Sequence, residues 1–335
     1  MPRDEYDDDR RTPDEYDPGF DRPGRRRRPP PRKAGNTLLW VFGGVGCLGL
    51  VVCGGLGGLV WWVLAPTRFP EQAGDYADAR KAFRTTLTTA GPAPQGHDPL
   101  DPPPGVEVVE YKSGNLTLAA WTTEPPAGGA RQPAVLYLHS GFAFGPDDWE
   151  EAEPLRKAGF AVFMPILRGE NGQPGNYTLF CDEVADAVAA TDALAKRPGV
   201  DTGKLFVAGY SSGGTLAMLT AMADKRFKGC GAISGSPDQG KFTQVRGADL
   251  LVPFDRTDPK EIAIRSPLAW PKSFKCPARL YVGRDELQYM WATNKLAEKA
   301  RAAGADVQCE ELDGDHDTVV RPALERMIGF FQTLE

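Results

Sequence analysis

The segment of residues 209–213, Gly-Tyr-Ser-Ser-Gly, constrains the fold of this chain more than any other part of its sequence. Residues 204–208 form a short, mostly apolar run that predicts a buried strand, and residues 213–222, rich in Ala, Leu and Met, predict a helix. A G-x-S-x-G pattern between a strand and a helix is typical of a sharp turn that exposes the serine hydroxyl. Glycines are required there because the two backbones come too close for side chains. Ser211 is therefore the predicted nucleophile.

A serine hydroxyl is a poor nucleophile at neutral pH and needs a base, which an acid orients. The chain has three histidines. His97 lies in a Pro- and Gly-rich stretch and is interpreted as a solvated linker residue, whereas His139 and His316 each follow an apolar run. After a G-x-S-x-G turn the partners follow in the order Ser, Asp or Glu, His. Only His316 lies downstream of the serine, on a loop between a predicted strand and a helix, so it is the predicted base.

The acid should lie on the loop that follows the preceding strand, residues 278–282. Two carboxylates compete there, Asp285 and Glu286. Spacing from the strand favours Glu286, and spacing from the following helix favours Asp285. We choose Asp285, because the shorter side chain is the commoner acid, and keep Glu286 as the alternative.

Residues 105–335 resemble the catalytic domain of the prolyl oligopeptidase family of serine peptidases and its relatives, the dienelactone-hydrolase-like esterases. The resemblance rests on segments 139–142 (HSGF), 158–165 (AGFAVFMP) with 168–169 (RG), 209–214 (GYSSGG), 283–286 (GRDE) and 314–316 (GDH). It implies an α/β-hydrolase fold and a serine hydrolase that needs no cofactor. These motifs do not separate a peptidase from a carboxylesterase, and a non-catalytic binding protein of the same fold remains a further alternative.

The resemblance also implies the oxyanion hole, in which backbone N–H groups stabilise the developing negative charge. One donor is the amide of Ser212, at the start of the helix after the nucleophile, where the helix dipole helps. The other is the amide of Gly141, in the turn after His139. The imidazole of His139 is then structural. Ser140 stands where such turns usually have glycine.

Alternating strands and helices from residue 134 onward predict a doubly wound, mostly parallel sheet of eight strands with helices on both faces. Strands are expected near 106–111, 116–122, 134–139, 160–164, 204–208, 229–233, 278–283 and 306–312, and helices near 148–158, 179–196, 213–223, 289–303 and 319–334. The first two strands should form an antiparallel edge. Residues 237–275 should cap the pocket, and Arg168 and Glu170 should form a structural ion pair.

The chain before the catalytic domain divides into three parts. Residues 1–36 are Pro-rich and densely charged, which predicts a disordered tail. Residues 37–65 include 27 consecutive residues without a charge, long enough as a helix (about 40 Å) to cross a bilayer. Because basic residues precede this span, the positive-inside rule predicts a cytoplasmic N-terminus and an extracytoplasmic catalytic domain. Residues 66–104 are expected to be a tether, with a short helix within 76–87.

The composition limits the partners. A net charge of −6 argues against nucleic acid as a substrate, and an ester or a short peptide is the expected one. No C-x-x-C motif or histidine cluster predicts a metal. Four cysteines lie in the catalytic domain, where an exported protein could form one or two disulfides in any of three pairings; the sequence decides neither this nor the oligomeric state.

Overall fold

The computed structural model describes residues 70–335, apart from residues 96, 97 and 246. The predicted tail (1–36) and transmembrane helix (37–65), together with His97, lie outside the described residues. Within the part of the chain that is described, none of the helices is both long and apolar enough to cross a membrane. The membrane span therefore stays a prediction.

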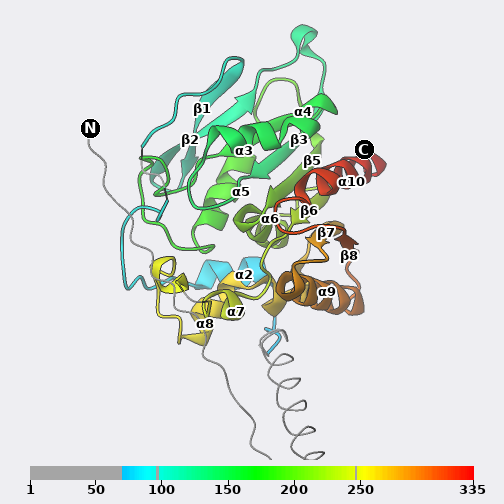
Figure 1. Cartoon of the computed structure of the whole chain (residues 1–335). Helices are drawn as coiled ribbons and strands as arrows, with labels where there is room; N and C mark the ends of the chain where they lie inside the picture. The colour runs from blue at the N-terminus through cyan, green and yellow to red at the C-terminus, as the bar shows by residue number, and fades with distance from the viewer. Residues whose placement is uncertain (1–69, 96–97, 246) are drawn as a thin grey trace, which may run out of the picture. The chain divides into compact units, whose positions relative to one another are not determined.

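The centre of the domain is one eight-stranded sheet in the order β1-β2-β4-β3-β5-β6-β7-β8 (Figure 1). Strands β3 to β8 pair in parallel, whereas β2 pairs antiparallel with both β1 and β4. The strands are β1 (Val106–Ser113), β2 (Leu116–Thr123), β3 (Gln132–Leu138), β4 (Ala161–Pro165), β5 (Val200–Tyr210), β6 (Gly229–Ile233), β7 (Ala278–Gly283) and β8 (Val307–Leu312). This confirms the predicted mostly parallel sheet and its antiparallel edge.

Helices cover both faces of the sheet, which is why its central strands are buried on both sides. In β3, Leu136 faces one apolar core, while Val135 and Tyr137 face the other. The first core packs against α5 (Glu183–Leu194), α6 (Ser212–Ala223) and α9 (Leu287–Ala302). The second packs against α3 (Pro146–Glu151), α4 (Glu153–Lys157) and α10 (Val320–Thr333).

Two of the predicted helices differ from the observed ones. The helix expected over 148–158 is divided into α3 and α4 around Ala152, because Pro154 lacks the N–H that would continue a single helix. The helix expected from 179 begins only at Glu183. Leu179 and Phe180 before it have positive φ angles of 51° and 62°, which no α-helix accommodates.

Residues 237–275 form a cap of short helices, as predicted. They are α7 (Gln239–Phe242), η2 (Ala248–Leu250), α8 (Pro259–Arg265), η3 (Pro267–Ala269) and η4 (Pro271–Ser273). Two of its side chains, Phe242 and Leu251, reach the pocket described below.

The segment expected to be a tether packs on the domain instead. It forms α2 (Tyr76–Ala82), as part of the predicted short helix, and Tyr76 is fully buried with its hydroxyl donating to Ile264 O (3.1 Å). Residues 85–95, which we call the strap, then run along the cap, where Thr88 N donates to Pro253 O (2.7 Å). The prediction of a separate tether over 66–104 is thus wrong for these residues, because side chains such as Tyr76 and Ala93 occupy fully buried sites on the domain.

The four cysteines of the domain, Cys181, Cys230, Cys276 and Cys309, are free thiols. Burial raises the pKa of the Cys181 thiol to about 11 and that of Cys276 to about 12. Both thiols therefore stay protonated at neutral pH and behave as apolar core side chains.

Arg265 of the cap ties distant parts of the fold together from a fully buried position. Its guanidinium lies 2.5 Å from Glu261 Oε2 and donates to Thr178 O (2.9 Å) and to Thr85 Oγ1 of the strap (2.8 Å). It also stacks over the ring of Phe254, 3.8 Å from the centroid. One cation thus joins the cap, the strap and the strained loop before α5.

Replacement of Arg265 with Met should destabilise the domain by about 3–5 kcal/mol, because it leaves the Glu261 carboxylate buried without its partner. Urea unfolding of the purified domain measures this loss. Lys81→Met is the matched control, since its ion pair with Asp78 is exposed on both sides and its loss should leave the unfolding midpoint unchanged. Equal unfolding midpoints for the two variants would contradict the stabilising role of Arg265.

Candidate active site

The predicted serine turn is present between β5 and α6. Ser211 has a φ angle of 54°, a strained conformation for a residue with a side chain. A Cβ atom at Gly209 would lie 2.3 Å from Gly213 O, and one at Gly213 would lie 1.9 Å from Leu138 O. Both glycines are therefore obligatory, and the packing holds Ser211 at the carboxyl edge of the sheet.

The loop between β8 and α10 brings His316 to this serine. Ser211 Oγ lies 2.9 Å from His316 Nε2, so the hydroxyl can donate to the imidazole. The other ring nitrogen, Nδ1, lies 2.5 Å from Glu286 Oε1. The structure thus brings together the predicted nucleophile, the predicted base and the alternative acid.

Glu286, not Asp285, lies against the histidine. The turn after β7 closes with Glu286 N donating to Gly283 O (3.1 Å), which directs residue 286 inward and leaves Asp285 exposed. Glu286 Oε2 accepts from Ser234 Oγ (2.6 Å) and from Gly283 N (2.8 Å). Our choice of Asp285 is corrected here, because the turn geometry decides which side chain reaches the imidazole.

The pair of His316 and Glu286 is electrostatically matched. Burial alone would raise the pKa of Glu286, but hydrogen bonds from His316 and Ser234 outweigh it and lower the pKa. The hydrogen bond to Glu286 in turn raises the pKa of His316. The acid therefore stays ionised and stabilises a protonated imidazole.

Two tyrosines frame the His316 ring. The ring centroid of Tyr210 lies 5.1 Å from it, and that of Tyr289 lies 5.6 Å away and nearly parallel. The Tyr210 hydroxyl donates to Asp317 Oδ1 (3.0 Å), on the loop that carries His316. The sequence analysis missed both tyrosines and Ser234, although the position of Ser234 directly after β6 was a usable signal.

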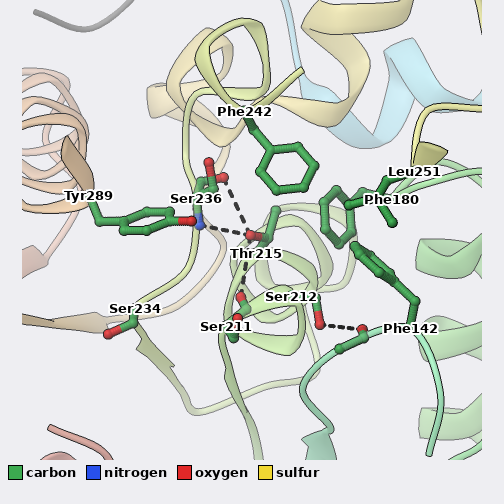
Figure 2. Close-up of a pocket in the computed structure, with 11 residues that line it drawn as sticks. Phe142, Phe180, Ser211, Ser212, Thr215, Ser234, Ser236, Phe242, Leu251 and Tyr289 are labelled. Carbon is green, nitrogen blue, oxygen red and sulfur yellow. Dashed lines mark hydrogen bonds between the residues drawn. The ribbon is translucent and has the colours of Figure 1, made fainter. Parts of the chain in front are cut away.

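The two predicted oxyanion donors lie beside the serine. Ser212 is the first residue of α6, where backbone N–H groups have no partner within the helix. Gly141 lines the same pocket, and Ser212 Oγ donates to its carbonyl oxygen over 2.6 Å (Figure 2). Both residues thus line the pocket beside Ser211.

His139, which is predicted to be structural, contacts the backbone of this loop and the side chain of Glu170. It is buried, with Nδ1 2.8 Å from Ser140 O and Nε2 2.9 Å from Glu170 Oε2. Burial would lower its pKa, but the Glu170 carboxylate outweighs burial and raises the pKa to about 9. The predicted pairing of Arg168 with Glu170 is wrong, since Arg168 pairs with Asp186 (2.7 Å).

The pocket beside Ser211 has a volume of about 110 Å³. Figure 2 shows three phenylalanine rings, from different segments of the chain, along one side of it. Its lining residues are Gly141, Phe142, Phe180, Ser211, Ser212, Thr215, Ser234, Ser236, Phe242, Leu251 and Tyr289. Such a pocket suits a small, uncharged apolar group. No cluster of metal-ligating side chains occurs among the described residues.

A mostly parallel eight-stranded sheet with a serine on this strand-to-helix turn defines the class of α/β hydrolases. The model of the alpha/beta hydrolase family matches residues 135–330, and the chain belongs to this family.

The similar proteins include peptidases and an esterase. The chain is 31% identical over 113 residues to the uncharacterized peptidase YtmA of Bacillus subtilis; these residues are 33% of this chain and 44% of that relative. A puromycin-hydrolyzing peptidase of Mycobacterium tuberculosis has a similar fold, with a TM-score of 0.60 and 19% identity over 68% of this chain and 39% of that one. The esterase Est22 has a TM-score of 0.53 and 18% identity, and the match covers 68% of this chain and 80% of the esterase. The chain thus spans less than half of the two peptidases.

Replacement of Glu286 with Gln should lower turnover by about 100-fold or more, because the carboxylate no longer holds the imidazolium. The same variant should move the acid limb of the pH–rate profile to lower pH. His316 must be neutral to accept a proton, and loss of the carboxylate lowers its raised pKa. Steady-state kinetics from pH 5 to 9 measure both effects.

Asp285→Asn is the matched control and should leave turnover and the pH profile unchanged, since its side chain is exposed. A larger loss in Asp285→Asn than in Glu286→Gln would restore the original choice of acid.

Proposed function

We propose that this chain is a serine hydrolase that cleaves ester or peptide bonds through an acyl-enzyme, as a peptidase of the prolyl oligopeptidase type. The observation that carries the proposal is the unbroken relay from Ser211 through His316 to Glu286, with heavy-atom distances of 2.9 and 2.5 Å. The first distance allows the hydroxyl to pass its proton to a general base, and the second lets the carboxylate orient and stabilise that base.

The mechanism follows from this geometry. His316 removes the Ser211 proton as the hydroxyl attacks the substrate carbonyl, and Glu286 stabilises the imidazolium that forms. The amides of Ser212 and Gly141 donate to the oxyanion of the tetrahedral intermediate. His316 then protonates the leaving group, and water activated by the same histidine releases the acyl group from the serine.

The size and lining of the pocket support a substrate with a small apolar group next to the scissile carbonyl. The names of YtmA and the puromycin-hydrolyzing peptidase favour a peptide or amide. An ester is the second candidate, because this chain covers most of the length of an esterase, Est22.

Ser211→Ala should abolish hydrolysis and labelling by a fluorophosphonate, because both need the Oγ nucleophile. The assays use short acyl p-nitrophenyl esters and proline-containing p-nitroanilides, and the ratio of kcat/KM on the two decides between esterase and peptidase. Ser113→Ala, at the end of the edge strand β1, is the control and should keep full activity.

A wild-type protein that is neither labelled nor active on either substrate class would favour the remaining alternative, a hydrolase-fold protein that binds without catalysis. Undiminished activity of Ser211→Ala would remove the serine mechanism.

We further propose that residues 37–65 anchor the enzyme in a membrane, with residues 1–36 in the cytoplasm and the catalytic domain outside. The uncharged run and the basic residues before it support this orientation.

Protease added to spheroplasts that express the full chain should digest the catalytic domain, and an antibody against a C-terminal tag follows its loss. A cytoplasmic marker protein should survive in the same sample. Protection of the domain until the membrane is lysed would contradict this orientation.

A further inference from the structure

We infer that Gln95, on the strap, is a positioning residue for the oxyanion loop, by which we mean residues 139–142 with the predicted donor Gly141. This inference rests on the proposed function and adds to it a side chain from outside the family-matched region, residues 135–330. Gln95 Oε1 accepts from Phe142 N over 2.8 Å. A Cβ atom on Gly141 would lie only 3.1 Å from the same oxygen, so the amide of Gln95 lies directly against this glycine.

The loop needs such a contact because its central residue is glycine. Gly141 has a φ angle of 65° and no side chain, so its own conformational preference does not fix the two peptide planes on either side of it. The Gly141 amide nevertheless has to point at one spot, since an oxyanion donor works only when it is preorganised. Contacts from outside the loop must therefore hold both planes.

Each of the two planes is held by neighbours. The plane of residues 140 and 141 is fixed by His139 Nδ1, which donates to Ser140 O (2.8 Å). In a trans peptide the N–H points away from the C=O, so this bond aims the Gly141 N–H in the opposite direction.

The plane of residues 141 and 142 is held at both ends. Ser212 Oγ donates to its carbonyl oxygen (2.6 Å), and its N–H donates to Gln95 Oε1 (2.8 Å). Ser212 comes from the nucleophile helix, whereas Gln95 comes from the N-terminal strap. Gln95 does not line the pocket, so its contact orients the loop from outside the reacting centre.

The strap is anchored firmly enough to act in this way. Two residues before Gln95, Ala93 is fully buried and its N–H donates to Gly169 O (2.9 Å). Gly91 O accepts from Tyr177 N (2.9 Å). The backbone that carries Gln95 is thus bonded to the segment that also contains Glu170, the partner of His139.

The test compares Gln95→Met, which keeps the length of the side chain but removes the acceptor, with Gln95→Glu, which keeps an acceptor oxygen. Gln95→Met should lower kcat and the rate of fluorophosphonate inactivation by about tenfold, the equivalent of one ordinary hydrogen bond, with KM little changed. Gln95→Glu should retain most of both rates. Gln72→Met is the matched control, because among the described residues its side chain bonds to Pro70 O alone, and it should behave as the wild type.

A second readout does not depend on activity. Hydrogen–deuterium exchange of the peptide that covers residues 139–145 should accelerate in Gln95→Met, since the Phe142 N–H loses its acceptor, and should be unchanged in Gln95→Glu and Gln72→Met. Thermal unfolding of all variants establishes that the fold is retained.

Unchanged exchange and kcat in Gln95→Met would overturn the inference, as would equal losses in Gln95→Met and Gln95→Glu. Failure of the proposed function is distinguishable, because it would appear in Ser211→Ala and the wild type, while the exchange measurement still decides the role of Gln95.

Discussion

The close packing of α6 against the strands is the constraint on which the rest of the site depends. At three successive contacts, at residues 209, 213 and 214, a Cβ atom would lie within 2.6 Å of a backbone oxygen. Only glycine permits this approach, and the approach forces Ser211 into its strained conformation with a positive φ angle. The hydroxyl then lies at the carboxyl edge of a parallel sheet, where the loops that follow β7 and β8 also begin. The acid and the base reach the serine because all parallel strands deliver their loops to that edge.

Two histidines, each paired with a glutamate, have different tasks because their burial differs. The His139 and Glu170 side chains are 1% and 4% exposed, and both ring nitrogens of His139 face acceptors, so this imidazole remains a cation with a pKa of about 9. The His316 side chain is 36% exposed and shares one nitrogen with a hydroxyl that donates to it. The first pair is therefore a fixed, buried contact to the loop that carries Gly141. The second pair is exposed enough for His316 to exchange a proton, as the proposed mechanism requires.

The sheet, its edge strands and the cap could be predicted from the sequence because runs of apolar residues and the spacing of turns are local signals. The choice between Asp285 and Glu286 could not be predicted, because the two residues are adjacent and the geometry of the turn after β7 decides which side chain reaches His316. Arg168 and Glu170 looked like a pair because they are close in sequence, but Asp186 and His139, far along the chain, are their partners. Tyr289 and Gln95 reach the site through contacts between distant segments, which composition and periodicity do not record. For Ser234, the local signal was its position directly after β6.

The strap links the cap to the loop that carries Gly141, one of the two predicted oxyanion donors. Thr88 N bonds to Pro253 O of the cap, Leu87 forms a β-bridge with Phe254, and Ala93 N bonds to Gly169 O of the core. Leu251, two residues before Pro253, lines the pocket. Any outward movement of this part of the cap must therefore break strap contacts or pull on the strap itself. The same strap ends at Gln95, so one continuous segment contacts both this part of the cap and the backbone of residue 142.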